Sequence, residues 1–283
     1  MSETVGAERV LDRAAKPGRR TKISVEGLAK CFTVGGSVHE VLGDVNLRVG
    51  ENEFVSIVGH SGAGKTTLLK CISGLESPSG GRILIDGEAI SGPPKRLALI
   101  FQDYGRSLFP WLRVLSNVTL PLRARPDIGR GERRSIAMAA LTAVGLADAT
   151  DHYPWQLSGG MQQRVAIARA IACEPDVLVM DEPFASVDAQ TRSDLEDLVL
   201  ELRRRYAMTA ILVTHDVDES VYMSDRVAVL DGSPTGVSQI IDVGLPGDRD
   251  QLTTKSLPEF VALRARVLQA VRGHASTGRT EDA

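Results

Sequence analysis

An apolar segment and a glycine-rich turn meet in the stretch Phe54-Val55-Ser56-Ile57-Val58-Gly59-His60-Ser61-Gly62-Ala63-Gly64-Lys65-Thr66-Thr67. Its first five residues predict a buried strand, and the apolar positions of Leu68–Ile72 suit one face of a helix. Between them, the spacing Gly-x-x-x-x-Gly-Lys-Thr is that of a phosphate-binding loop, or P-loop. The stretch therefore predicts an α/β domain that binds a nucleoside triphosphate.

Each part of this loop suits a triphosphate. The glycines let backbone N–H groups converge on one concavity, and the helix N-terminus adds partial positive charge. Lys65 supplies a full charge for the β- and γ-phosphates, and the Thr66 hydroxyl is suited to ligate Mg²⁺. His60 is interpreted as a spacer within the loop. The residues predicted to hold the nucleotide are Gly59, His60, Ser61, Gly62, Ala63, Gly64, Lys65, Thr66 and Thr67.

The bulk properties narrow the class of protein. The chain has 283 residues, a net charge of −3 and a pI near 6.0, which argues against nucleic acid as its main partner. It contains no apolar run of about 18 residues, so it is not expected to span a membrane itself. Residues Met1–Lys22 are basic but lack an apolar central region, which predicts a disordered arm rather than a secretory signal.

The remaining pattern predicts how the chain is organised. Alternating segments at Leu42–Val49 and Gly81–Gly87 indicate antiparallel strands. Continuous apolar runs, typical of a parallel sheet covered on both faces, occur at 177–180, 210–213 and 227–230. We expect a disordered basic arm at 1–22, the ATPase domain at 23–245 with a helical subdomain at about 103–160, a short extension with a helix at 246–272 and a disordered tail at 273–283.

Two carboxylates end the apolar run Val177–Met180. Asp181 stands where the second half of a P-loop site anchors Mg²⁺. Glu182 follows at once, and a carboxylate just past a strand end can orient and deprotonate a water molecule aimed at the γ-phosphate. Neighbouring residues within a strand point to opposite faces of the sheet. Asp181 and Glu182 can therefore serve two roles at the ATP site only because the strand ends at this point.

A second anion-binding helix start is predicted at Ser158-Gly159-Gly160. The longer stretch Leu157–Arg164 resembles the signature of ATP-binding-cassette (ABC) proteins. This resemblance implies an α/β P-loop NTPase fold, with a mixed sheet, an antiparallel β subdomain and an inserted α-helical subdomain. It also implies a head-to-tail homodimer, in which Ser158 and Gly160 of one chain complete the ATP site on the other chain's P-loop.

Four further residues take their roles from the resemblance alone. Gln102 corresponds to the glutamine that touches Mg²⁺ and senses the transmembrane partner, and His215 to the histidine that contacts the γ-phosphate. Asp188 corresponds to the aspartate that couples the two ATP sites, and Phe32 to the ring that stacks on adenine. From the residues alone, a core position stays open for Phe32 and for His215. The implied catalytic set is Lys65, Gln102, Glu182 and His215, and the implied Mg²⁺ ligands are Thr66, Gln102 and Asp181.

The sequences of these motifs are similar to those of importers of the nitrate, sulfonate and taurine type. The resemblance lies in Phe101–Leu112, Thr214–Glu219 and Asp248–Leu252, whereas Ala185-Ser186-Val187 departs from the usual Gly-Ala-Leu before the coupling aspartate. It implies a transport-coupled ATPase at the cytoplasmic face of the inner membrane. Its partners would be permease subunits and, indirectly, a periplasmic or lipid-anchored solute-binding protein.

Several alternatives stay open at this point. Phe109 and Trp111 suit either packing of the helical subdomain or contact with the permease. A soluble ABC ATPase of DNA repair or translation, a non-hydrolysing interaction module and an exporter are the competing classes of protein. Nothing in the sequence separates nitrate from an alkanesulfonate, taurine or a pyrimidine precursor as the solute.

Overall fold

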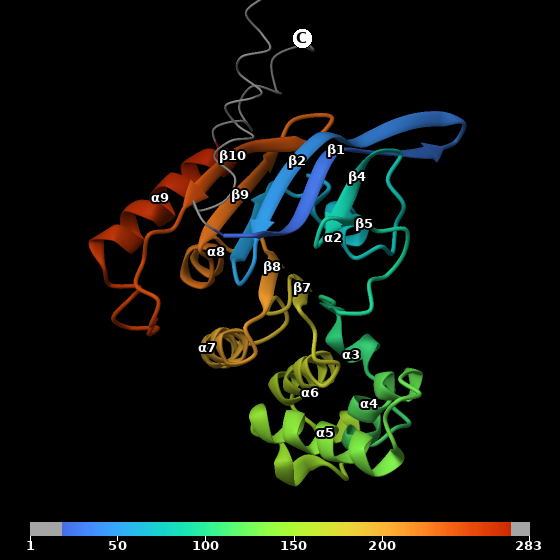
Figure 1. Cartoon of the computed structure of the whole chain (residues 1–283). Coiled ribbons are helices and arrows are strands. Elements are labelled where there is room, and N and C mark those ends of the chain that lie inside the picture. The colour runs from blue at the N-terminus through green and yellow to red at the C-terminus, as the bar shows by residue number, and fades with distance from the viewer. Residues whose placement is uncertain (1–18, 273–283) are drawn as a thin grey trace, which may run out of the picture. The chain divides into compact units, whose positions relative to one another are not determined.

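The computed structural model describes residues 19–272. They form two compact units, one made of the residues up to Pro94 together with those from Thr209 on, the other of Lys95–Met208 (Figure 1). Of the predicted arm at 1–22, positions 1–18 lie outside the described residues. Its last two residues, Thr21 and Lys22, belong to a strand rather than to the arm. The predicted tail at 273–283 lies outside them entirely. Within 19–272, no helix combines the length and the hydropathy needed to cross a membrane.

The first unit contains an antiparallel sheet whose strands lie in the order β2-β1-β4-β5. A hairpin joins β1 to β2 through Gly35 and Gly36, whose φ angles of 59° and 85° match the twist of the flanking strands. The predicted antiparallel strands at 42–49 and 81–87 fall within this sheet. Its strands are β1 (Thr21–Val34), β2 (Ser37–Gly50), β4 (Gly80–Ile85) and β5 (Glu88–Ala89).

A second, mixed sheet of this unit carries the P-loop. Strand β3 (Phe54–Gly59) runs parallel to both β8 (Thr209–Val213) and β9 (Arg226–Asp231), and β10 (Gly236–Asp242) is antiparallel to β9. Every residue of β3 and β8 is buried, as their continuous apolar runs predict. The P-loop turn thus follows a buried strand that has a neighbour on each side.

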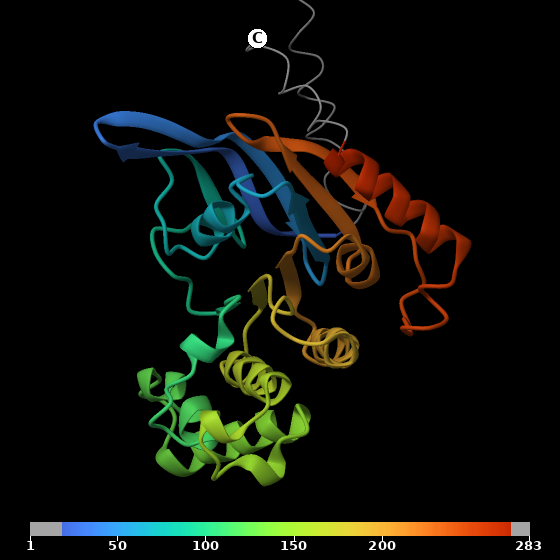
Figure 2. The same cartoon turned by 180° about the vertical axis from the view of Figure 1, so that it is seen from behind.

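Three helices complete the first unit. Helix α2 (Lys65–Ile72) follows the P-loop, α8 (Val217–Met223) follows β8, and α9 (Pro258–Arg272) forms the end of the described chain. Figure 2 shows α9 lying along β9 and next to α8, contacts that the coordinates also record. The helix expected within 246–272 is therefore present, and it is anchored by Phe260 and Val267, which are buried.

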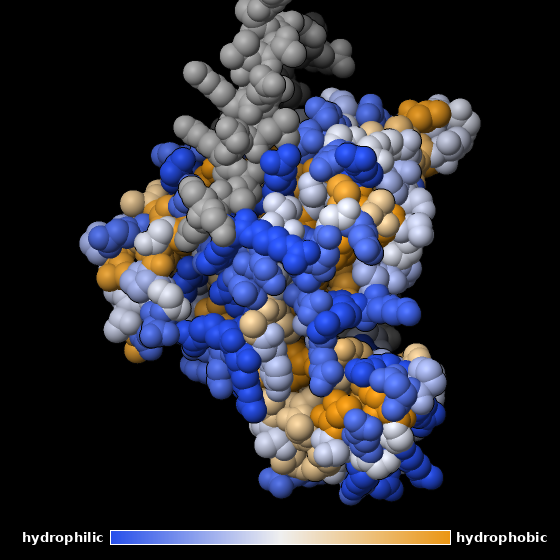
Figure 3. Space-filling model, viewed as in Figure 1, coloured by the Kyte–Doolittle hydropathy of each residue, from blue (hydrophilic) through white to orange (hydrophobic). Residues whose placement is uncertain are grey.

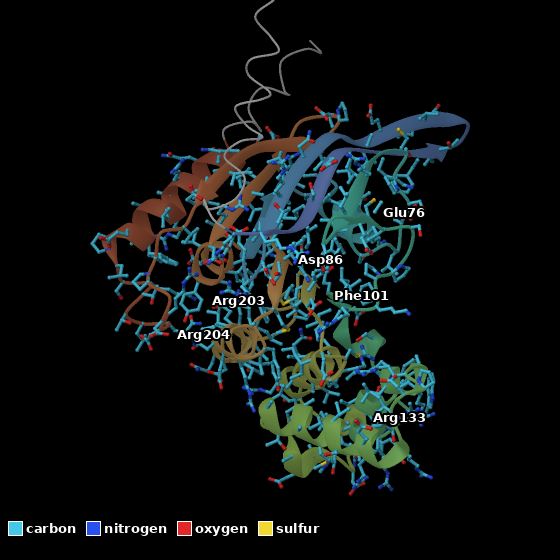
Figure 4. The ribbon with its side chains drawn as sticks, viewed as in Figure 1. Glu76, Asp86, Phe101, Arg133, Arg203 and Arg204 are labelled. Atoms are coloured by element: carbon cyan, nitrogen blue, oxygen red, sulfur yellow. The ribbon has the colours of Figure 1, made fainter. Side chains whose placement is uncertain are left out.

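The second unit combines two parallel strands with a group of helices. Strands β6 (Leu97–Ile100) and β7 (Val177–Asp181) pair in parallel. Helices α4 (Val114–Thr119), α5 (Arg130–Ala143) and α6 (Gly159–Ile171) pack on one another, with Val118, Leu141 and Val165 fully buried. The remaining elements are α3 (Tyr104–Ser107), η1 (Pro121–Ala124), η2 (Ala147–Ala149), η3 (Pro154–Gln156) and α7 (Ala189–Arg205), which ends in the arginines labelled in Figure 4.

Candidate nucleotide site

The P-loop turns between β3 and α2 in the conformation that its glycines allow. Gly62 and Gly64 have φ angles of 83° and 65°, in the left-handed region that side chains disfavour. A Cβ added at Gly62 would meet no atom within 4 Å, so one side of the turn is open. Gly64 precedes α2 and makes no side-chain cap bond, and the partial positive charge of this helix start favours an anion.

Lys65 holds its ammonium over the turn. Its Nζ donates to the carbonyl oxygens of Gly59, at 2.9 Å, and of His60, at 3.0 Å, and the residue is only 8% exposed. A buried ammonium is stabilised far better by anionic oxygens than by neutral carbonyls. The loop therefore fits a phosphate group. The ring of His60 is exposed and its Nδ1 lies 2.8 Å from the Ser61 carbonyl oxygen, which keeps it on its own loop.

His215 lies at the same edge of the sheet as the P-loop. Ile57 of β3 pairs with Val213 of β8, and both strands run in the same direction. Gly59 and His215 each stand two residues further along, so the two segments leave neighbouring strands at one edge. His215 is exposed there, which removes the alternative of a core histidine.

Phe32 lies near the end of β1, opposite His39 of β2. Its ring is partly exposed, so it is not a core side chain. The ammonium of Lys30 stands 4.8 Å from the ring centroid while it is paired at 2.5 Å with Glu76, labelled in Figure 4. A stacking role for Phe32 stays a prediction.

In the second unit, the two predicted carboxylates lie at the end of β7 in different environments. Asp181 is the last residue of the strand and is 7% exposed. The backbone then turns sharply at Glu182, whose φ of 43° lies in a region that non-glycine residues seldom adopt. This turn ends the strand between the two carboxylates, as their separate roles require.

Gln102 and Glu182 are brought together by strand register. Ile100 of β6 pairs with Met180 of β7, and each of the two polar residues stands two positions further on. The side-chain amide of Gln102 donates to Glu182 Oε2 over 3.1 Å. Gln102 is exposed and Glu182 is half-buried, so the pair is accessible from solvent.

The signature stretch begins α6. Ser158 is the N-cap of this helix, and its Oγ accepts from the Met161 amide at 3.3 Å. The hydroxyl hydrogen stays able to donate to an anion, since that bond uses only an acceptor position. Ser158 and Gly159 are exposed, so this helix start faces solvent, as a site completed by a second chain requires.

Asp188 and Gly160 meet through Thr191, a residue to which the sequence reasoning assigned no role. Asp188 is the N-cap of α7 and accepts from the Thr191 amide, at 3.0 Å, and hydroxyl, at 2.7 Å. These bonds, that of the amide first, hold the pKa of the Asp188 carboxyl below its usual value. A Cβ added at Gly160 would stand 2.4 Å from Thr191 Cγ2. Asp188 just before a helical pattern is the signal for an N-cap, and an N-cap side chain bonds to the amide three residues on, which here is that of Thr191.

Comparison with known proteins identifies the family of this chain. The family model described as ABC transporter matches residues 42–185. The uncharacterized ABC transporter ATP-binding protein MJ0412 of Methanocaldococcus jannaschii is 44% identical over 253 residues, 89% of this chain and 92% of that protein. The bicarbonate transport ATP-binding protein CmpD of Synechocystis is 37% identical over 268 residues, 93% and 94% of the two chains.

Two further similarities bear on the activity. The nitrate import ATP-binding protein NrtC of Synechococcus elongatus is 41% identical over 249 residues, which are 87% of this chain but only 38% of that protein. A dimeric, post-hydrolysis structure of the ATP-binding cassette MJ0796 with ADP and Pi has a TM-score of 0.69 and 33% identity, and the match covers 78% of this chain and 98% of that one.

The strand–P-loop–helix unit and the paired carboxylates define a P-loop ATPase. The chain belongs to the ABC transporter family. It is an ATP-binding subunit of a transporter, and it hydrolyses ATP.

Proposed function

We propose that this chain powers an ABC importer, in which two copies bind ATP between them and drive a separate membrane permease. The solute is a small anion of the nitrate, sulfonate or taurine type. Support comes from the motif wording in the sequence and from relatives named for the import of nitrate and the transport of bicarbonate, both small oxyanions. The observation that carries the hydrolytic part is the Glu182 carboxylate, turned out of β7 by its positive φ and bonded to Gln102.

At the nucleotide, Lys65 and the loop amides from Gly59 to Thr67 hold the β- and γ-phosphates. Thr66, Asp181 and Gln102 would hold Mg²⁺, which shields phosphate charge when bound. Their hydroxyl, carboxylate and amide oxygens are ligands that this hard cation prefers. Phe32 would stack on the adenine ring through its partly exposed face.

Hydrolysis uses this chain's own groups. Glu182 accepts a proton from a water molecule whose oxygen bonds to the γ-phosphorus, and the bond to the β–γ bridging oxygen breaks, which releases ADP and phosphate. His215 donates to the γ-phosphate, and so do Ser158 and Gly160 of a second copy. Asp188, through its fixed place beside the signature helix, couples the two sites of the homodimer.

A prearranged aromatic loop in the second unit suits contact with a permease. The buried Asn117 accepts from the Phe109 amide at 2.8 Å and donates to the carbonyls of Phe109, at 3.1 Å, and Leu112, at 3.0 Å. This loop presents Trp111, which is 70% exposed and stacks edge-on with Phe109 at 5.5 Å. Side chains so exposed contribute little to internal packing, so they favour the docking role.

Further apolar surface of the second unit is visible in Figure 3. Trp155 is also 70% exposed, and its ring stacks on that of Tyr153 at 6.0 Å. Aromatic residues are enriched in the buried centres of protein interfaces. We infer that the permease docks on this unit and keeps the chain at the cytoplasmic face of the membrane.

Gentle detergent co-purification of the tagged chain, with mass spectrometry of the bound proteins, tests the proposal. We expect polytopic permease subunits, and loss of them on Trp111→Ala but not on Leu252→Ala, a residue of the first unit that is 79% exposed. Recovery of the chain alone, with its ATPase activity intact, would instead favour a soluble ABC ATPase. Uptake of nitrate, bicarbonate, alkanesulfonate and taurine is then compared between wild-type cells and cells that carry the Glu182→Gln variant. The solute whose uptake the variant abolishes identifies the solute class.

A further inference from the structure

The segment that follows β10 returns to the C-terminal end of α8. Arg249 donates from Nη1 to the carbonyls of Val221 and Tyr222, and from Nη2 to that of Ser224 at 2.7 Å. The last carbonyls of a helix lack partners within the helix and carry partial negative charge. Helix α8 has no basic residue in its own last turn, so Arg249 supplies the positive charge from outside it.

Two more contacts tie the extension to α8. Lys255 holds its ammonium 4.7 Å from the ring centroid of Tyr222, a side chain that is fully buried. Arg264 of α9 pairs at 3.7 Å with Asp218, in the first turn of α8. The extension thus touches both ends of a helix of only seven residues. A helix this short has little stability of its own and depends on such tertiary contacts.

The opposite end of α8 determines how His215 is held. Asp216, the next residue, is the N-cap and accepts from the amides of Asp218, at 2.8 Å, and Glu219, at 3.2 Å. Thr214, the preceding residue, donates to the Glu219 carboxylate at 2.6 Å, and its hydroxyl accepts from the Asp216 amide at 3.0 Å. Both neighbours of His215 are therefore bonded to the first turn of α8.

The helix is also bonded to the P-loop strand. The hydroxyl of Ser224, at the C-cap of α8, is hydrogen-bonded to the hydroxyl of Ser56 in β3 over 2.7 Å. Arg249 binds the carbonyl of this same serine. Hydrogen bonds link the two ends of α8, because the Ser224 hydroxyl donates to the Ser220 carbonyl and the Ser220 amide donates to the Asp216 carbonyl at 3.1 Å. A displacement of the C-terminal end would therefore reach Asp216, next to His215.

We propose that the C-terminal extension positions His215, with Arg249 as the positioning residue that acts through α8. The inference rests on the proposed role of His215 at the γ-phosphate and goes beyond it, because it assigns a task to a segment outside the ATP site. Loosening the extension should slow hydrolysis and leave nucleotide binding intact. Binding is expected to persist because the P-loop lies between β3 and α2, whereas Arg249 donates to the carbonyls at the C-terminal end of α8.

The experiment compares full-length Arg249→Ala, Arg249→Lys and Arg266→Ala. Arg266, exposed on α9, is the matched control. A small misplacement of a catalytic group can cost about 100-fold in rate, so we expect kcat to fall roughly 10- to 100-fold in Arg249→Ala with the KM for ATP unchanged. Arg249→Lys keeps the positive charge but not the planar guanidinium group, so its kcat should lie between those of the wild type and Arg249→Ala. Thermal melting verifies that each variant is folded. If Arg249→Ala does not fold, the comparison is made with Arg249→Lys instead.

Combination with His215→Ala separates positioning from general loosening. If Arg249 acts through His215, Arg249→Ala should not lower the residual single-turnover rate of His215→Ala any further. An equal fall in both backgrounds, or an unchanged kcat in Arg249→Ala alone, would overturn the inference. A wild-type rate in His215→Ala would instead reject the proposed role of His215 itself, so the two failures are distinguishable.

Discussion

The side-chain amide of Gln102 donates a hydrogen bond to the carboxylate of Glu182 over 3.1 Å, and each residue stands two positions beyond a register pair of β6 and β7. The proposed general base therefore has a partner on the neighbouring strand. That partner belongs to the segment that resembles the glutamine loop, which leads on towards the exposed Trp111. A change in this loop would change the surroundings of Glu182 directly.

Loss of the P-loop ammonium should abolish nucleotide binding. Lys65→Ala removes the charge that now lies over the Gly59 and His60 carbonyls, and with it the main attraction for the β- and γ-phosphates. Isothermal titration with ATP should show no saturable binding. Lys70→Ala, at an exposed position of the same helix, should bind like the wild type. Unchanged affinity in Lys65→Ala would refute the P-loop interpretation.

Replacement of Gly160 should destabilise the second unit even though alanine is the better helix former. The new Cβ would stand 2.4 Å from Thr191 Cγ2, and the bonds from Thr191 to Asp188 prevent that side chain from rotating away freely. Overpacking of this kind costs about 1–3 kcal/mol of unfolding free energy. Urea denaturation should show this loss in Gly160→Ala.

Thr191→Ser supplies the control for that prediction. It deletes the Cγ2 methyl group and keeps the hydroxyl that donates to Asp188. In this background Gly160→Ala should cost little. An equal loss of stability in both backgrounds would show that the Thr191 contact is not the cause.

The Asp188 cap gives the unfolding free energy a defined dependence on pH. Hydrogen bonds from the Thr191 amide and hydroxyl lower the pKa of Asp188 in the folded chain. Stability from such a group is complete above the ordinary aspartate pKa of about 4 and is lost as the pH falls through the lower folded value. Asparagine still caps a helix but does not titrate in this range.

The measurement is the difference in unfolding free energy between the wild type and Asp188→Asn. It should be constant near neutral pH and should shrink as the pH falls below about 4. A difference that does not vary with pH would contradict the assigned shift.

Loss of one partner of a buried ion pair should strongly lower the unfolding free energy of the first unit. Glu53 and Arg226 are 0% and 1% exposed and are joined by two bonds, of 2.6 Å and 2.8 Å. Glu53→Gln would leave a buried guanidinium without its counter-charge, and breaking such a pair costs about 3–5 kcal/mol. Chemical denaturation should reveal this loss, whereas the exposed Glu51→Gln should be neutral. A loss below about 1 kcal/mol would mean that the pair is not needed.

The sequence predicted the inner strands, the P-loop and the signature helix because each has a strong local pattern. It did not predict one continuous strand over Thr21–Val34, because Gly27 suggests a turn. In the structure Gly27 has a φ of 57° and lies where the register with β2 shifts, so it marks a bulge rather than an end.

The candidate site shows the same limit. Each motif could be recognised, but the contact of Gln102 with Glu182 depends on β6 pairing with β7, which no local pattern records. The bonds of Arg249 to α8 likewise join segments that are distant in sequence. Such contacts depend on topology, whereas residue types and spacings report only on local structure.

Glu182 is proposed to act as the general base for ATP hydrolysis in a chain that dimerises when it binds ATP. Removal of a general base typically lowers a rate by about 10²- to 10⁴-fold. Glu182→Gln keeps the size of the side chain and its ability to accept from Gln102, so ATP binding should persist. The variant should accumulate as an ATP-bound dimer.

The direct test is phosphate release by Glu182→Gln, measured beside light scattering with and without ATP. Glu201→Gln, exposed on α7, is the matched control and should behave as the wild type. We expect almost no phosphate release and a stable dimer that appears only with ATP. Normal release from Glu182→Gln would contradict it.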